Sequence, residues 1–223
     1  MAELYHLGVP TAAVPRLALL VDPQLGSAPA VAAVRGRPLA ARREYESHLG
    51  TWAGQDILVT TIGIGAPPLA IAIEELARAG AESVVLLGAA MFDGLSTRWL
   101  LPYGATRGDG TSAQYAPLQF PAVPDPGMRA ALAEASGDAA SYGIVETVDV
   151  LAAEANGHPT SGRELRCAAL FVVASVRGVR AAALLADPSD AATAQADAST
   201  IHDMAVAACR ALTAPIDTRQ GQS

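Results

Sequence analysis

Three charged residues of this chain stand where acid or anion chemistry is possible. Asp187 ends the apolar run "AAALLAD", and a carboxyl at the end of a buried strand can have its pKa raised by desolvation, as a general acid requires. Glu164 and Arg166 lie two residues apart at the start of a helical pattern. Because an arginine has no acceptor, Arg166 can bind a carboxylate or pair with Glu164. The chain therefore offers one candidate acid and one candidate anion-binding group.

Each of these residues also has a purely structural interpretation. Asp187 precedes a proline, and aspartate at such a position often makes a turn or caps a helix. Glu164 and Arg166 can equally face solvent in the first turn of their helix. Both interpretations remain open at the level of sequence.

A further candidate position has no polar side chain. The stretch 83–94, "SVVLLGAAMFDG", predicts a buried strand that runs into a glycine turn, and residues 84–92 carry no charge, hydroxyl or amide. Ligands of open α/β sheets bind at the carboxyl ends of strands. The segment after Gly88 is therefore a candidate pocket wall, with ordinary core packing as the alternative for Met91 and Phe92.

The elements that position these residues alternate along the chain. Such alternation predicts an α/β fold, with a mostly parallel sheet covered by helices on both faces. We expect a single domain over residues 1–214 and a frayed polar tail over 215–223. Strand-like runs occur at 17–21, 57–61, 83–88, 142–151 and 179–187, and helical patterns at 67–80, 126–136, 163–178 and 197–212.

The segment 102–125 breaks this alternation. It is rich in Gly, Pro, Thr, Ser and Asp, and it is too long for an ordinary loop. We therefore expect a functional loop or an excursion at an interface.

Composition excludes several classes of function. A formal charge of -7 and an isoelectric point near 5.0, without a basic run, argue against a nucleic-acid partner. All fifteen cationic residues are arginines, so a mechanism that needs a lysine is excluded. Cys167 and Cys209 lie in apolar patterns without metal-ligand spacing, which predicts buried free thiols, a reducing cytoplasm and no metal or cofactor. No signal peptide or membrane-spanning run is visible.

Four segments carry a resemblance to a known family. They read "YHLGV" at 5–9, "RREY" at 42–45, "TIGIGAPPLAIAIEELARAG" at 61–80 and "DGTSAQYAPLQFPAV" at 109–123. The chain resembles the nucleoside phosphorylases, and "APLxFPAV" is typical of their uridine phosphorylase branch. The resemblance implies the three-layer nucleoside phosphorylase fold, with a twisted, mostly parallel or mixed sheet. It also implies homodimers or hexameric rings of dimers, with sites at the dimer interface, and reversible phosphorolysis of an N-glycosidic bond.

The positions that bind phosphate in the family are altered. In "VDPQL", which resembles the family turn "GDPDR", Leu25 takes the place of an arginine. At the strand end, Leu86 and Ala89 stand for an arginine and a threonine. Arg43, which in the family reaches the neighbouring subunit's site, remains, with a structural interface role as its alternative. Each lost charge-assisted contact forfeits roughly 1.5 to 3 kcal/mol, so we expect an apolar pocket without tight phosphate binding.

The positions that bind the base and the sugar are also altered. Segment 149–157, "DVLAAEANG", resembles the base-binding segment only at its aspartate, and Leu151 replaces the stacking phenylalanine. Of two sugar-binding glutamates, Glu164 remains and Arg166 replaces the other. His6 resembles the histidine that reaches the sugar of the adjacent subunit, with a surface position as its alternative. Asp187 falls where the purine-specific branch carries the aspartate that protonates the leaving base.

These substitutions predict an enzyme that keeps the cleft of the family and acts on another small molecule, with specialised metabolism as its expected setting. We expect the ligand to be more apolar than uridine, with a carboxylate or hydroxyl near Arg43, Arg166 and His6, and with Asp187 as the acid. One alternative is cleavage of a nucleoside by water or by weakly bound phosphate. Another is a non-catalytic member that binds a ligand or assembles with an active paralogue.

Overall fold

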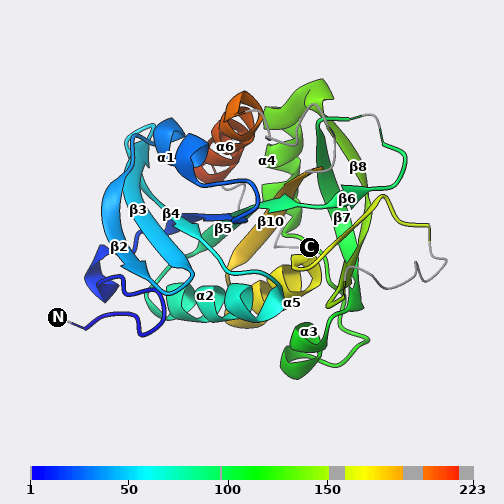
Figure 1. The fold of residues 1–223 in the computed structure, drawn as a ribbon, viewed down its shortest axis with the longest axis horizontal. Coiled ribbons are helices and arrows are strands. Elements are labelled where there is room, and N and C mark those ends of the chain that lie inside the picture. Colours follow the sequence, from blue (N-terminus) through cyan, green and yellow to red (C-terminus); the bar gives the residue numbers. More distant parts are fainter. Residues whose placement is uncertain (1, 96, 151–158, 188–197, 216–223) are drawn as a thin grey trace.

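The described strands form one mixed sheet of ten, with helices on both faces (Figure 1). The computed structural model describes residues 2–95, 97–150, 159–187 and 198–215. The strand order is β2-β3-β4-β1-β5-β10-β7-β8-β9-β6. The strands are β1 (Leu17–Val21), β2 (Arg37–Arg42), β3 (Tyr45–Trp52), β4 (Gln55–Thr61), β5 (Ser83–Ala89), β6 (Met91–Phe92), β7 (Trp99–Gly108), β8 (Ala140–Val148), β9 (Gly162–Glu164) and β10 (Arg180–Ala186).

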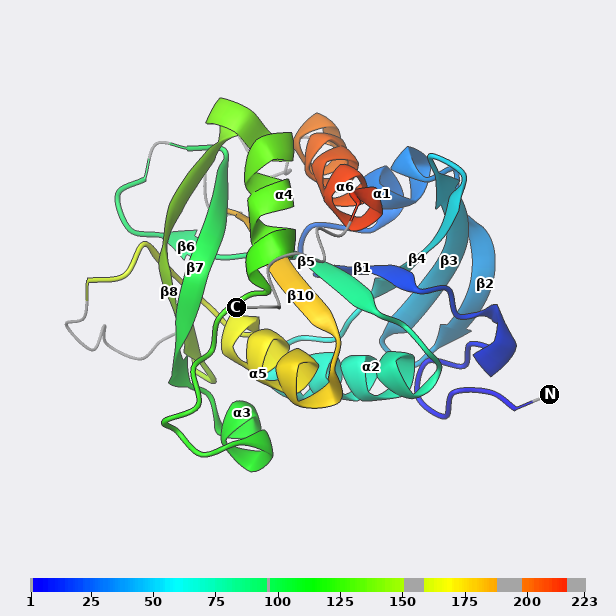
Figure 2. The same ribbon diagram turned by 180° about the vertical axis from the view of Figure 1, so that it is seen from behind.

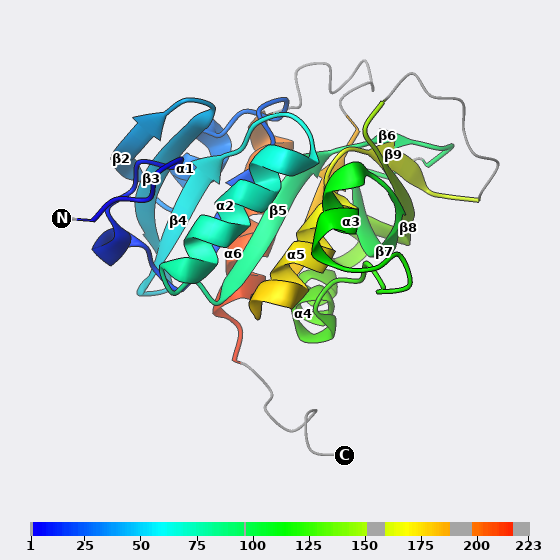
Figure 3. The ribbon, with the colours of Figure 1, turned by 90° about the horizontal axis from the view of Figure 1, so that it is seen from below.

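Six α-helices within the described residues cover this sheet. Figure 3 shows α2, α5 and α3 on one face, and Figure 2 shows α4 lying across β10 and β7 on the other face, beside α6 and α1. This three-layer arrangement confirms the predicted fold class. The helices are α1 (Ala28–Ala33), α2 (Ala66–Arg78), α3 (Gly110–Tyr115), α4 (Pro126–Ser136), α5 (Cys167–Arg177) and α6 (Ala198–Thr213).

The central strand β5 separates two hydrophobic cores. Successive side chains of a strand point to opposite faces, so Val84 and Leu86 pack toward α2 and α5, while Val85 and Leu87 pack toward α1, α4 and α6. All four side chains are completely buried. A strand covered on both faces has no polar face, which explains why the sequence of β5 is continuously apolar.

The parallel strands at the centre all end at the same edge of the sheet. β1 pairs in parallel with β4 and with β5, and β5 pairs in parallel with β10. The register places Ala186 opposite Ala89 and Val21 opposite Leu87. Residues that follow these strands are therefore brought together whatever their separation along the chain.

Several predicted elements agree with the structure, and others do not. The strand at 17–21 and the helix at 126–136 have the predicted bounds. The predicted helix at 163–178 begins only at Cys167, because residues 162–164 pair with β8 and β6 as the short strand β9. The antiparallel hairpin of β2 and β3 was not predicted, because its exposed and buried positions mix polar and apolar residues.

The expectation of one long loop over 102–125 is wrong for residues 102–115, and a functional or interface role of the segment stays a prediction. Residues 102–108 belong to β7, which pairs with β8 along its length, and α3 follows directly. Asp109 caps α3 by accepting a hydrogen bond from Ser112 N at 2.6 Å. Polar residue types misled the prediction because β7 is half exposed toward its end.

Arg107 organises the backbone that follows β7. Its Nε donates to Ser112 Oγ at 3.0 Å, and its NH2 donates to the carbonyl oxygens of Ser112 and Ala116, each at 2.8 Å. Its NH1 donates to Pro117 O at 2.6 Å and to Phe120 O at 2.9 Å. One guanidinium therefore satisfies four carbonyl oxygens of a segment that has no sheet partner for them.

Both cysteines are buried free thiols, as predicted. Burial raises the pKa of the Cys209 thiol to about 12 and the pKa of the Cys167 thiol well above its ordinary value. Neither thiol is therefore ionised near neutral pH, and both act as small apolar residues. No helix of the described residues is both long and apolar enough to cross a membrane.

We expect Arg107→Lys to lower the free energy of unfolding by about 2 to 4 kcal/mol, because an ammonium cannot reproduce the planar set of donors. Guanidinium unfolding measures the loss, and limited proteolysis should show faster cleavage within residues 109–121. The matched control is Arg16→Lys, at an exposed surface ion pair with Glu82, where the change should stay within about 0.5 kcal/mol. Equal stability losses in the two variants would contradict this role for Arg107.

Candidate ligand site at the strand ends

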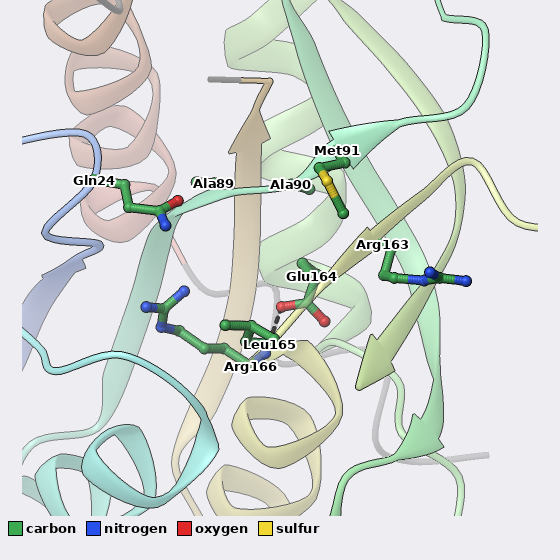
Figure 4. Close-up of a pocket in the computed structure, with 8 residues that line it drawn as sticks. All are labelled: Gln24, Ala89, Ala90, Met91, Arg163, Glu164, Leu165 and Arg166. Carbon is green, nitrogen blue, oxygen red and sulfur yellow. Dashed lines mark hydrogen bonds between the residues drawn. The ribbon is translucent and has the colours of Figure 1, made fainter. Parts of the chain in front are cut away.

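A small cavity lies at the edge where the parallel strands end (Figure 4). Its water-accessible volume is about 30 Å³, which is room for roughly two water molecules. The β6 and β9 strands close one side, since Met91 pairs with Arg163. The described lining consists of Gln24, the strand-end residues Ala89, Ala90 and Met91, and the four consecutive residues Arg163, Glu164, Leu165 and Arg166.

Arg166 forms a buried ion pair with Asp22 beneath this cavity. Arg166 NH1 donates to Asp22 Oδ2 at 2.5 Å, and the two side chains are 2% and 0% exposed. Arg166 NH2 donates to Gly63 O at 3.3 Å. Asp22 also accepts hydrogen bonds from Gln24 N at 2.9 Å and from Ala89 N at 3.2 Å. The pair therefore joins the end of β1, the end of β5 and the start of α5.

Arg166 Nε is the one nitrogen of this guanidinium that donates no hydrogen bond to a described residue. It is buried and has no hydrogen-bond partner among the described residues. A buried donor without an acceptor costs about 1 to 3 kcal/mol. The Nε atom has almost no accessible surface, so this unpartnered donor lies within the packed protein rather than on the open wall of the cavity.

Glu164 lies between β9 and α5, and its carboxylate caps the helix. It accepts hydrogen bonds from Arg166 N at 2.6 Å and from Cys167 N at 2.8 Å, and it accepts a short hydrogen bond from the Thr147 hydroxyl. Its side chain is 2% exposed. Burial raises the pKa of Glu164, and the three hydrogen bonds and the Arg166 charge oppose that shift.

Arg163 is also paired with a carboxylate. Its Nε donates to Glu146 Oε2 at 2.9 Å, and the two side chains are 14% and 7% exposed. Figure 4 shows Arg163 and Arg166 on opposite sides of Glu164. The cavity therefore has two guanidinium groups, and each has its own carboxylate partner.

Four of the predicted site residues line this cavity, and the others lie elsewhere or outside the described residues. Ala89, Met91, Glu164 and Arg166 line it together, and the two charged residues are buried rather than solvated. Leu151 lies outside the described residues. The roles of these residues in binding stay predictions.

The expectation of an apolar pocket at this edge stays a prediction. The described lining combines the strand-end residues and Leu165, which supply hydrocarbon, with two arginines and a glutamate. Leu25 and Leu86 do not line the cavity, because they pack into the two cores on opposite faces of the sheet. Gly88 is likewise a buried strand residue, and a Cβ there would meet Leu185 Cδ2 at 2.8 Å. Core side chains surround these three residues in the structure, and their roles in binding stay predictions.

Asp187 follows β10 next to the cavity and contacts the backbone of β6. Its Oδ2 accepts a hydrogen bond from Phe92 N at 2.9 Å. This contact holds Phe92 beside the end of β10 and corresponds to the structural interpretation of Asp187. Its role as an acid stays a prediction.

His6 and Arg43 lie on either side of Tyr5, and neither is among the described residues that line the cavity. Arg43 follows β2, and its guanidinium lies 5.1 Å from the Tyr5 ring centre. Glu75 of α2 fixes the segment, since its carboxylate accepts hydrogen bonds from His6 N at 2.9 Å and from Leu7 N at 3.0 Å. Neither ring nitrogen of His6 has a partner among the described residues.

Asp22, Gln24, Arg163 and Glu146 were missed in the sequence. Asp22 had a usable signal, since it follows a predicted strand and is the acidic residue of "VDPQL". Arg163 immediately precedes Glu164, but the predicted helix hid its place on a strand. No cluster of three or more His, Cys, Asp or Glu within the described residues has a geometry that suits a metal ion.

We expect Arg166→Met to lower the free energy of unfolding by about 3 to 5 kcal/mol, because it leaves the buried Asp22 carboxylate without its counter-charge. The double variant Asp22→Asn with Arg166→Met removes both charges, and it should recover part of this loss. Denaturant unfolding of both variants and the wild type measures the difference. If the double variant is as unstable as the single variant, the ion pair does not have the assigned role.

Glu164 should make stability depend on pH. Its folded-state pKa is raised, so its contribution to stability is full below the unfolded-state pKa and is lost as pH rises through the folded-state value. The stability of the wild type relative to Glu164→Gln should therefore fall as the pH rises above the ordinary pKa of a glutamate, about 4.3. Urea unfolding of both proteins across this range measures the trend, with Glu134→Gln on the exposed side of α4 as control. A relative stability that rises with pH would contradict the shift.

Comparisons with known proteins agree with the fold and the segment matches. The family model described as "Phosphorylase superfamily" matches residues 8–217. A uridine phosphorylase from Treponema pallidum is 32% identical over 206 residues, which cover 81% of this chain and 80% of that protein.

Solved structures give the same result. The crystal structure of uridine phosphorylase from Vibrio fischeri ES114 superposes with a TM-score of 0.85 at 23% identity, over 95% of this chain and 98% of that one. The same enzyme in complex with 6-hydroxy-1-naphthoic acid superposes with a TM-score of 0.82 at 24% identity, over 95% and 96% of the two chains. Because the family match covers nearly the whole sequence, this chain belongs to the phosphorylase superfamily, and uridine phosphorylases are among its relatives.

Proposed function

We propose that this chain is a nucleoside phosphorylase-like enzyme that does not use phosphate and that acts on a different small molecule in the same cleft. One observation carries the proposal: both arginines at the strand-end cavity are already paired with buried carboxylates, Arg166 with Asp22 and Arg163 with Glu146. A phosphate site needs cationic groups and donors that are free to bind a dianion.

The balance of charge around the cavity supports this proposal. Glu164 adds a third carboxyl group to the two guanidinium groups and their two partners. A phosphate dianion would approach three carboxyl groups and would have to replace the partner of at least one arginine. The removal of a partner from a buried charge pair costs about 3 to 5 kcal/mol. The contacts that phosphate makes would have to offset this cost.

The ligand we propose is partly apolar. Leu165, Ala89, Ala90 and Met91 supply hydrocarbon at the cavity, and Met91 is 40% exposed at its edge. The Vibrio fischeri enzyme, which has the same fold, has been crystallised with 6-hydroxy-1-naphthoic acid, a fused aromatic ring with one carboxyl and one hydroxyl group. That complex supports an aromatic ligand with few polar groups as a reasonable probe. A role in specialised metabolism and a cytoplasmic location remain part of the proposal.

Two further elements of the proposal concern the acid and the assembly. Asp187 is the proposed general acid, because it lies at the end of β10 beside Phe92, within reach of the cavity edge. His6 and Arg43 are proposed to serve the site of a second copy in a homodimer or a ring of dimers, as the resemblance to the family implies.

A second candidate function is the cleavage of a nucleoside N-glycosidic bond. The 32% identity to a uridine phosphorylase over four fifths of both chains favours it. The retained Glu164 also favours it, because the corresponding family residue binds the sugar. Water or weakly bound phosphate would then attack the anomeric carbon.

A nucleoside panel separates the two functions. The purified protein is incubated with uridine, thymidine, inosine and guanosine, with and without inorganic phosphate, and free base is measured by chromatography. The uridine phosphorylase of Treponema pallidum serves as the positive control. We expect no phosphate-dependent release of base. Release that increases with phosphate would disprove the proposed function, and release that is equal without phosphate would establish hydrolytic cleavage instead.

A further inference from the structure

Arg180 begins β10, at the edge of the sheet opposite the strand-end cavity. Arg180 and Ala186 are the first and last residues of this strand, so roughly 20 Å separates them at the usual rise of a strand. The Arg180 side chain is half-buried, and its Nε and NH2 donate to Ser83 Oγ at 3.2 and 2.8 Å. Ser83 is buried, so a neutral hydroxyl holds the guanidinium in place.

No carboxylate neutralises this guanidinium. Arg180 forms no ion pair with any described residue, whereas Arg163 and Arg166 at the other edge are each bonded to a buried carboxylate. Arg180 NH1 has no partner in the described part of the chain, and it is not one of the buried polar atoms there. NH1 is therefore an accessible charged donor. A half-buried cation without a counter-charge favours an anionic ligand.

The carboxylates nearest Arg180 are held elsewhere. Asp125 caps α4, since its Oδ1 accepts a hydrogen bond from the first turn of that helix at 2.7 Å. Glu82 is exposed and is paired with Arg16. Glu134 is exposed on α4, about 12 Å beyond the start of the helix. These charges leave Arg180 unneutralised, but they disfavour a ligand group with more than one negative charge.

A cavity opens beside Arg180 between α4 and the end of α6, two helices that lie side by side (Figure 2). We call it the α4–α6 cavity. Its water-accessible volume of about 560 Å³ lies in the range of sites for small organic molecules. Ala130, Ala211 and Pro215 contribute hydrocarbon, and Arg180 is the one cation among the described lining residues. The cavity can therefore take an apolar body whose anionic end reaches Arg180.

We propose that the α4–α6 cavity is a second ligand site, which binds a small molecule with one carboxylate on an apolar body, and that Arg180 binds the carboxylate. The inference goes beyond the proposed function, because this site lies at the other edge of the sheet and takes no part in the reaction. One accessible guanidinium nitrogen suits a single carboxylate, and Asp125 and Glu134 oppose a phosphate dianion.

The first test compares benzoate with benzamide, two probes of nearly equal size, in titrations followed by NMR of the ligand. We expect the wild type to bind benzoate at least about fivefold more tightly, as one charge-assisted hydrogen bond allows. Arg180→Gln should remove this preference. Arg37→Gln, which removes an exposed charge of β2, should keep it. No preference in the wild type, no binding of benzoate, or an unchanged preference in Arg180→Gln overturns the inference.

A second test leaves Arg180 in place. Ala130→Glu adds a carboxylate at the cavity on the exposed side of α4, and glutamate is compatible with a helix. The matched control, Ala32→Glu, adds the same charge on the exposed side of α1. We expect benzoate to bind Ala130→Glu at least about fivefold more weakly than the control, with equal binding of benzamide. Equal affinities for benzoate in the two variants overturn the inference.

A third test locates the probe in the unaltered protein. Crystals of the wild type are soaked in para-bromobenzoate, and the anomalous signal of bromine marks each bound molecule. Bromine in the α4–α6 cavity, with the carboxylate at Arg180, supports the inference. Bromine only in the strand-end cavity, or at neither place, overturns it and leaves the proposed function unaffected.

Discussion

The buried ion pair between Asp22 and Arg166 is the interaction on which this site depends. It connects the end of β1, through Asp22, with the start of α5, and the same carboxylate accepts a hydrogen bond from Ala89 N at the end of β5. A buried pair of this type contributes little net stability compared with apolar residues of equal volume, but either charge alone is costly. The pair therefore constrains both residues together, and it fixes the polar groups of the cavity before any ligand is bound.

This constraint changes how the substitutions in the chain are understood. Viewed singly, Leu25 and Leu86 suggest that polar contacts were simply lost. In the structure both leucines pack into cores on opposite faces of the sheet, and the charge at the strand ends comes from Arg166 and Asp22. Arg163 and Arg166 are each bonded to a carboxylate of the same chain. The charge at this cavity is therefore set by ion pairs within the protein, which the two leucine positions alone do not indicate.

The parts predictable from sequence are those where one physical signal dominates. β5 and α4 were predictable because continuous apolar burial and a proline-initiated helix are strong local patterns. The hairpin of β2 and β3 and the short strand β9 were not, because their stability comes from pairing with distant residues. The same distinction applies to the site. Glu164 and Arg166 could be singled out as charged residues at a helix start, but 144 positions separate Asp22 from Arg166, and no local pattern links them.

Position in the strand order is a poor guide to distance in this fold. β6 stands last in the order, yet only one residue separates it from β5, so the cavity is lined from the ends of β1 and β5 as well as from β6 and β9. The turn between β2 and β3, at the other end of the order, also approaches this site. Gly63 O accepts a hydrogen bond from Arg166, and a Cβ placed at Gly63 would lie 3.0 Å from Glu44 Cγ, next to Arg43. The curvature of the sheet therefore brings residues of both ends of the strand order toward Arg166.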